Sequence, residues 1–363
     1  ATQNFTTATS SYNTAVGASA GTSVTTAQNS TIIGALAGDA ITTGGNNTLV
    51  GYNSGGAIIG GDTNSAFGKD ALKTCTTGTN NSAIGTRSLQ LLTSAANCIA
   101  VGDLAGAAIT TGSGNTFVGA NAGDSCTDSA NCVAIGINAL GGADADHSNV
   151  AVGQLTLNTC TGDSNTAVGD RAGSDVTSGD NNLFLGQDAG RTGAPGGSIT
   201  TANNTIVLGD GSIANAHIQV DWTVASDKRD KTDVEPVKMG LDFVKELEPV
   251  TYRWDKRSKY VDESDDTVDL NDVVHDGTHK EDWSDIGFLA QDVEVLEEKY
   301  GHKITDKTNL TTNLSEDGKQ YGIQYSKFVP ILVKAIQELS KKNDALETKN
   351  DALEARIKTL EDA

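Results

Sequence analysis

A short apolar motif that ends in glycine recurs through the first part of the chain at an almost constant interval. It reads NTAVG at Gly17, STIIG at Gly34 and NTLVG at Gly51, so the glycine returns at every seventeenth position, with one interval shorter by a single residue. The eleven glycines are Gly17, Gly34, Gly51, Gly68, Gly85, Gly102, Gly119, Gly136, Gly153, Gly169 and Gly186. A fixed period of this kind predicts a repeat architecture in which each unit stacks on the next.

Two consecutive columns of the repeat are apolar throughout, those of Ala15 and Val16 in the first unit. Neighbouring side chains of a strand face opposite ways, so one column fills the interior and the other needs a cover, most simply another copy of the chain. A further apolar column through Val24, Ile41 and Ile58 predicts a second short strand. We therefore expect a parallel β-solenoid of roughly 50 Å, rising about 4.8 Å per coil.

The remaining columns predict how the coils turn and hold together. The glycines supply a backbone angle that other residues resist or allow a close approach, and small residues three places later, such as Ala20 and Ala37, fit a tight corner. Asparagines recur as Asn13, Asn47 and Asn64, either as turn caps, which general turn preferences favour, or as an amide ladder across coils.

All five cysteines fall within the repeats: Cys75, Cys98, Cys126, Cys132 and Cys160. Members of one column are at least two coils apart, about 9–10 Å, which is beyond disulfide reach. We expect reduced, buried thiols, because a metal site would favour closer spacing such as C-x-x-C.

These repeats resemble the N-S-x-A-I-G-x-x-A repeats in the heads of trimeric autotransporter adhesins, which are trimers of parallel β-rolls. The resemblance covers residues 13–190 and implies a homotrimeric shaft. The interval between successive motifs is longer here than in those heads.

The composition changes sharply at Ser226. Residues 1–225 hold 35 of the 41 glycines, no Glu, and five basic against fifteen acidic residues; residues 226–363 hold 21 basic and 32 acidic residues. Acidity in both parts argues against a nucleic-acid partner, and no apolar run is long enough for membrane insertion. The first residue, Ala1, is not Met, so we expect a piece of a longer protein whose missing N-terminal part joins other proteins.

The interval between the repeats and Ser226 reads as a connector. After Gly190 the period fails, and Ile206, Leu208, Ile218, Val220 and Trp222 belong to an alternating apolar pattern. We assign residues 1–190 to the solenoid shaft and 191–225 to a connector with a closing β-segment.

Three ordered blocks follow: SDKRDKTDVEPVKMGLDFVKELEPVTYRWD from Ser226, GFLAQDVEVLEEKYG at 287–301, and YGIQYSKFVPILVKAIQELSKKNDALE from Tyr321. They resemble the intramolecular chaperone domain of phage tail spikes and fibres, the peptidase S74 family, also found in endosialidases and the myelin regulatory factor. The resemblance implies an α+β chaperone at 226–330 that trimerises, helps a β-rich fibre fold and then cuts itself off. It places the cut between Ala225 and Ser226, with Ser226 as nucleophile and Lys231 as its activating partner.

The implied chemistry suits these residue types. A serine hydroxyl needs a base, and a lysine desolvated in a trimer interface can act as one; Asp227 and Arg229 could hold the turn. Without the flanking blocks, a Ser and a Lys five residues apart would be a chance surface pair. We expect no cofactor and no metal: the acidic run 261–285, with His275 and His279, lacks calcium-loop spacing and reads as a solvated insertion.

The last stretch, 331–363, has a heptad seam that predicts a coiled coil: Leu332, Ile336, Leu339, Asn343, Leu346, Asn350, Leu353, Ile357 and Leu360. Asn at the a positions is more typical of dimers, whereas the resemblance implies a trimer.

The function expected from these features is a tail fibre or spike segment of a virion, made in the host cytoplasm, that attaches to a host receptor such as a glycan or outer-membrane component. The alternative is a bacterial trimeric surface adhesin without enzymatic activity. No motif for catalysis on an external substrate is present.

Overall fold

The computed structural model describes residues 11–261 and 269–362. They divide into two compact units, the first ending at Ile213 and the second beginning at Ala214. The fold is mainly β, with a parallel β-solenoid followed by an α+β unit that carries a long C-terminal helix, as the sequence predicts.

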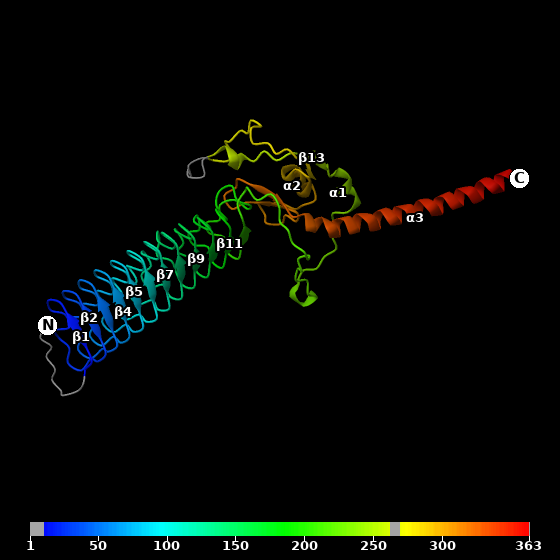
Figure 1. The fold of residues 1–363 in the computed structure, drawn as a ribbon. Helices are drawn as coiled ribbons and strands as arrows, with labels where there is room; N and C mark the ends of the chain where they lie inside the picture. The colour runs from blue at the N-terminus through cyan, green and yellow to red at the C-terminus, as the bar shows by residue number, and fades with distance from the viewer. Residues whose placement is uncertain (1–10, 262–268, 363) are drawn as a thin grey trace. The chain divides into compact units, whose positions relative to one another are not determined.

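The first unit is a solenoid with one parallel sheet, whose strands stack in chain order (Figure 1). Its strands have three residues each: β1 (Thr14–Val16), β2 (Thr31–Ile33), β3 (Thr48–Val50), β4 (Ser65–Phe67), β5 (Ser82–Ile84), β6 (Ile99–Val101), β7 (Thr116–Val118), β8 (Val133–Ile135), β9 (Val150–Val152), β10 (Thr166–Val168), β11 (Leu183–Leu185) and β12 (Ile206–Leu208). Equivalent positions of the repeat pair directly, for example Thr14 with Thr31.

The two apolar columns separate as the strand geometry requires. The central residue of β2–β12 is buried, whereas Val16, Ile33 and Phe67, at the ends of their strands, are 58, 39 and 40 % exposed. The interior column thus fills the coil, and the outer column forms an apolar stripe on the sheet.

The prediction of a second strand in each coil is wrong. Val24, Ile41 and Ile58 are fully buried, but each lies outside any strand. The chain reaches them through turns in which Gly21, Gly38 and Gly55 have φ angles between +49° and +60°. Hydrogen bonds still link these turns from coil to coil, for example from the Gly21 N–H to the Ala37 carbonyl at 3.0 Å, but the backbone is not that of a strand.

The strand pattern at 206–224 is also only partly confirmed. β12 pairs in parallel with β11, so it continues the solenoid sheet beyond residue 190. From Ile213 to Val224 there is no strand, and the apolar side chains of Ile213 and Val224 are exposed.

The glycine column has a backbone angle and a closeness that exclude a side chain. Gly51 has φ +139°, and a Cβ there would lie 2.4 Å from the carbonyl oxygen of Gly68 in the next coil. The close approach is therefore between coils of one chain. Ala20 and Ala37 are fully buried at the corner, as expected.

The asparagine column links successive coils. Asn64 Nδ2 donates to the Gly78 carbonyl (2.8 Å), and Asn64 Oδ1 accepts from the backbone N–H (3.1 Å) and Nδ2 (3.1 Å) of Asn81. Asn165 bonds Gly179 and Asn182 in the same way. These asparagines form a buried ladder across coils instead of only capping their own turns.

We expect Asn64→Ala to destabilise the solenoid by about 1–3 kcal/mol, because it leaves the Gly78 carbonyl and the Asn81 N–H buried without their partner. Ser65→Ala is the matched control, since that side chain is the next along and only half-buried. Thermal unfolding of both variants measures the difference. Equal melting temperatures would contradict a stabilising role for the ladder.

The cysteines are all free and buried, which confirms the expectation of reduced thiols. Burial raises the pKa of Cys75 to about 11, of Cys126 to about 12 and of Cys160 to about 11. Thiols with such values remain protonated at neutral pH and react slowly.

The second unit contains small sheets and helices around one core. It comprises η1 (Lys228–Asp230), α1 (Leu241–Glu246), β13 (Val250–Tyr252), η2 (Arg257–Tyr260), β14 (Asp285–Gly287), α2 (Ala290–Lys299), β15 (Thr312–Leu314), β16 (Tyr321–Ile323), η3 (Tyr325–Lys327) and α3 (Phe328–Glu361). β13 pairs antiparallel with β14, and β15 with β16. The core consists of Met239, Phe243, Val293, Leu296, Phe328 and Ile331.

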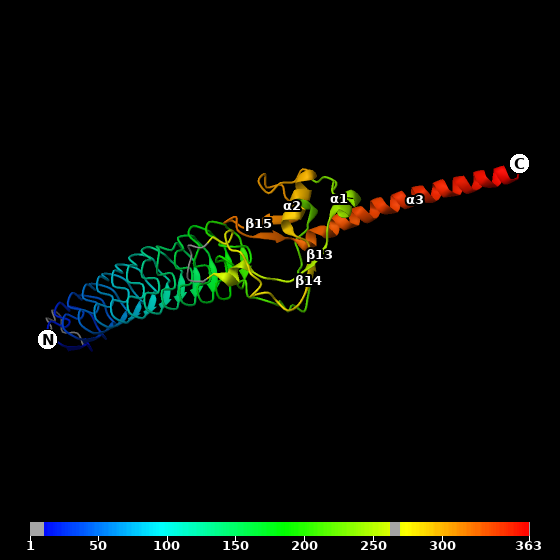
Figure 2. The same ribbon diagram turned by 90° about the horizontal axis from the view of Figure 1, so that it is seen from above.

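Polar anchors tie this core to its loops. Glu297 is 1 % exposed and accepts hydrogen bonds from the backbone N–H groups of Thr311 (2.6 Å) and Thr312 (3.3 Å). Glu338, on α3, accepts from the Leu241 N–H at 2.8 Å and so fixes the start of α1. The whole of α3 is a single helix of 34 residues, about 51 Å long, and its C-terminal part extends beyond this core (Figures 1 and 2).

Candidate functional site

A tight turn at the start of the second unit brings Ser226 and Lys231 together. Asp227 is the N-cap of η1, and its Oδ1 accepts a hydrogen bond from the Arg229 N–H at 2.9 Å. The turn closes through the Lys231 N–H, which donates to the Lys228 carbonyl at 3.3 Å. As a result Lys231 Nζ lies 2.6 Å from Ser226 Oγ and donates to it.

Asp227 and Arg229 hold this turn from outside. The Arg229 guanidinium reaches both carboxylate oxygens of Asp227, with Nη2–Oδ2 at 2.6 Å and Nε at 3.1 Å from each. The hydrogen bonds from Arg229 hold the pKa of the Asp227 carboxyl below its ordinary value. These contacts are to each other and to the turn, so the two residues hold the backbone conformation of the turn.

The site is open to water in a single chain, because residues 226–231 are all exposed. A hydroxyl becomes a nucleophile when a neighbouring base removes its proton, and an amine acts as that base only where desolvation favours its neutral form. One chain therefore supplies the contact between Ser226 and Lys231 but leaves both side chains exposed to water.

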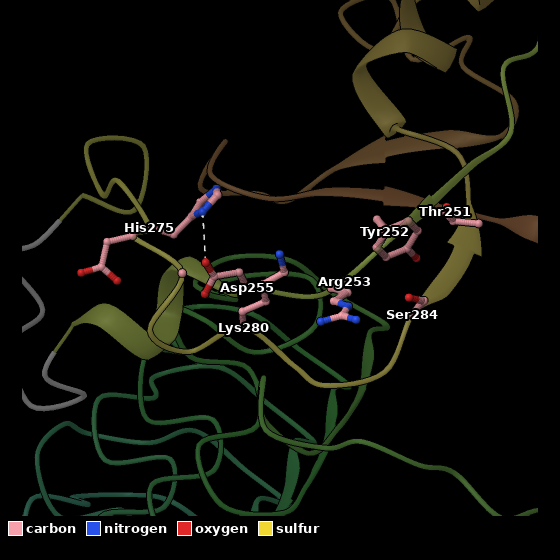
Figure 3. Close-up of a pocket in the computed structure, with 9 residues that line it drawn as sticks. Thr251, Tyr252, Arg253, Asp255, His275, Lys280 and Ser284 are labelled. Carbon is pink, nitrogen blue, oxygen red and sulfur yellow. Dashed lines mark ion pairs between the residues drawn. The ribbon is translucent and has the colours of Figure 1, made fainter.

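A cavity of about 550 Å³ lies between β13 and the loop that precedes β14. Thr251, Tyr252, Arg253, Asp255, His275, Asp276, Gly277, Lys280 and Ser284 line it (Figure 3). His275 Nδ1 is 3.2 Å from Asp255 Oδ2, and the Tyr260 hydroxyl donates to Asp255 Oδ1 at 2.7 Å. The wall is mixed in charge, and Figure 3 shows Ser284 well apart from His275, so this serine does not pair with the imidazole.

The acidic insertion provides no calcium-like cluster among the residues that the structure describes. Asp262, Glu263, Asp265 and Asp266, which the sequence assigned to it, lie outside the described residues. Asp276 accepts from the backbone and hydroxyl of Thr278, which lowers the pKa of the carboxyl.

The two histidines of this loop are engaged separately. His275 pairs with Asp255, and the His279 ring packs edge-on against Tyr260 at 4.6 Å. They do not converge on a shared ligand position.

One group with metal-ligand proximity, Asp146, His147 and Asp163, occurs on the solenoid and was missed in the sequence. All three side chains are exposed, and they are already paired: His147 Nδ1 is 2.7 Å from Asp146 Oδ1, and Asp163 Oδ1 accepts the His147 backbone N–H at 3.0 Å. The residues come from neighbouring coils, so ligand spacing along the chain does not reveal them.

No helix within the described ranges is both long enough and apolar enough to span a bilayer.

These features define a class of protein in which a β-solenoid is followed by an α+β unit. A contact between a serine and a lysine lies near the start of that unit. Residues 226–301 match the family model described as chaperone of endosialidase, peptidase S74. The match begins at Ser226, the residue at which the composition changes, and implies an autoproteolytic chaperone for this part of the chain. The sequence block from Tyr321 lies beyond it. Comparison with curated proteins found no match.

Proposed function

We infer that this chain is a segment of a phage tail fibre or spike whose C-terminal unit is a trimerising chaperone that cleaves itself between Ala225 and Ser226. The observation that carries the inference is the 2.6 Å contact between Lys231 Nζ and Ser226 Oγ at the first residues of the matched family region. Two residues with the chemistry of nucleophile and base meet at the point where the family match begins.

The reaction uses the chain's own atoms and one water molecule. Ser226 Oγ attacks the carbonyl carbon of Ala225 while its proton passes to Lys231 Nζ. The C–N bond between the two residues breaks, Lys231 returns the proton to the leaving amine of Ser226, and an ester joins Ala225 to Ser226 Oγ. Water then hydrolyses the ester, which leaves a carboxylate on Ala225 and a free serine.

Trimer formation is supported by the α3 seam. Its aliphatic residues, from Leu332 to Leu360, are 43–70 % exposed in the single chain. A row of Leu and Ile at heptad spacing is stable in water only when partner helices cover it. The outer stripe of the solenoid includes the exposed side chains of Val16, Ile33 and Phe67. Packing against other copies of the chain would bury these side chains as well.

In this function the shaft carries the host contact and the C-terminal unit is released after folding. The host receptor is a glycan or outer-membrane component, and other tail proteins are further partners. The assembled fibre belongs to the virion. Ser226 and Lys231 then matter for maturation and not for receptor binding.

The oligomeric state of the uncut chain tests this proposal. Light scattering of Ser226→Ala at micromolar concentration should give three times the 37.4 kDa chain mass. Leu346→Ser with Leu353→Ser should weaken the trimer by more than about tenfold, because polar side chains at d positions lose the apolar contacts of the seam. Ala345→Ser with Ala352→Ser, one residue earlier on the helix, should leave it unchanged. An uncut Ser226→Ala chain that is monomeric at this concentration would refute the proposal.

A further inference from the structure

The stretch that leads into the Ser–Lys site has apolar side chains and no structural partner. Val220, Trp222 and Val224 are 74, 74 and 80 % exposed, and Ile218 is 53 % exposed. None of residues 214–225 donates or accepts a hydrogen bond with any residue that the structure describes. A dozen consecutive residues therefore leave all their backbone groups to solvent.

The pattern of this stretch is that of a strand with one apolar face. Ile218, Val220, Trp222 and Val224 alternate with Gln219, Asp221 and Thr223, so all four apolar side chains project to one side of an extended chain. From 218 to 224 such a strand spans about 23 Å at roughly 3.3 Å per residue. In the single chain the backbone bends at Gln219 and Val220, so pairing requires the segment to straighten. An extended segment with free backbone groups pairs readily with another strand.

The charge of the stretch favours its own copies as partners. Residues 214–225 contain one acidic residue, Asp221, and no Lys or Arg, in a chain of net charge −21. Identical copies of most acidic surfaces repel one another, whereas this stretch can associate at little electrostatic cost. In-register α3 helices of a cyclic trimer also bring identical residues of the three chains to the same level.

We propose that residues 217–225 of three chains pair as strands around a shared core of Val220, Trp222 and Val224, and that this pairing is what makes the Ala225–Ser226 bond cleavable. The inference rests on the trimer and self-cleavage of the proposed function. Carbonyl directions alternate along a strand, so ordering the segment up to Ala225 fixes the direction of the carbonyl that Ser226 attacks. Cleavage then follows assembly, and an unassembled chain keeps its chaperone.

Hydrogen exchange on full-length Ser226→Ala tests the pairing. In the trimer, amides of residues 218–224 should exchange about 100-fold more slowly than in an unstructured peptide of the same sequence. A trimer in which these amides exchange at the peptide rate would overturn the strand proposal and leave the proposed function standing. A monomer would refute both. Protection that appears only after phosphatidylethanolamine vesicles are added would assign the segment to a lipid surface and overturn pairing between chains.

Two neighbouring substitutions separate the apolar face from the general effect of a new charge. In the cleavable chain, Val220→Asp should slow release of the N-terminal fragment at least about tenfold, because a carboxylate would be buried in the shared core. Gln219→Asp adds the same group on the opposite face and should cleave at the parent rate. Equal rates for the two variants, with both chains trimeric, would contradict the coupling of cleavage to this strand.

Discussion

Ser226→Ala should leave the chain in one piece of 363 residues, whereas the parent chain should separate into one fragment that ends at Ala225 and another that begins at Ser226. Alanine removes the oxygen that forms the ester, so the loss should be on the order of 1,000-fold or more in rate. Denaturing gels and intact-mass spectrometry of freshly purified protein measure the result. A parent chain that folds, forms trimers and stays whole would sink the self-cleavage claim.

Lys231 provides the matched pair for this experiment. Lys231→Ala removes the group that contacts Ser226 Oγ at 2.6 Å, and Lys231→Arg keeps a cation that does not give up its proton. Both should remain uncut if the lysine acts as a base. If the arginine variant cleaved at the parent rate, Lys231 would contribute only its positive charge and would not act as a base.

Gly51→Ala should lower the stability of the solenoid by about 2–6 kcal/mol, which combines backbone strain with overpacking. The residue has φ +139°, and the new Cβ would lie 2.4 Å from the Gly68 oxygen, a separation that the coils must widen to accommodate. The melting temperature of the variant, measured on the Ser226→Ala chain so that cleavage does not intervene, reports this loss.

Gly60→Ala is the control within the same repeats. Its Cβ would lie 3.4 Å from Thr43 Oγ1, an ordinary contact, and its φ is outside the left-handed region. The expected change is within about 0.5 kcal/mol. If the Gly51→Ala and Gly60→Ala variants had the same melting temperature, the close approach of the coils at Gly51 would not contribute to stability.

The solenoid was predictable because its signal is repeated eleven times in register. The two apolar columns at Ala15 and Val16 and the glycine column that begins at Gly17 determine the strand, its buried face and the following turn. The second strand was predicted wrongly because burial of Val24 looks the same in sequence whether the chain reaches it as a strand or through a turn at Gly21. Apolar periodicity predicts which side chains are buried in the solenoid interior, but it does not predict which backbone hydrogen bonds form.

The functional site was only partly accessible to sequence reasoning. The family resemblance implies Ser226 and Lys231, and their spacing alone does not predict the turn capped by Asp227 that brings them into contact. The alternating pattern that ends at Val224 predicted a strand for which a single chain has no partner, since strand pairing is a property of two segments. The group around His147 was missed because its members meet only after coils stack.

The direct pairing of equivalent repeat positions, such as Thr14 with Thr31, makes the shaft extensible in fixed steps. Removing or duplicating one whole repeat returns each remaining coil to a neighbour with the same glycine, asparagine and apolar positions. Each such event changes the length of the solenoid by about 4.8 Å and leaves both ends intact. Unequal recombination within this gene segment can therefore adjust the length of the solenoid without a change in any contact between coils.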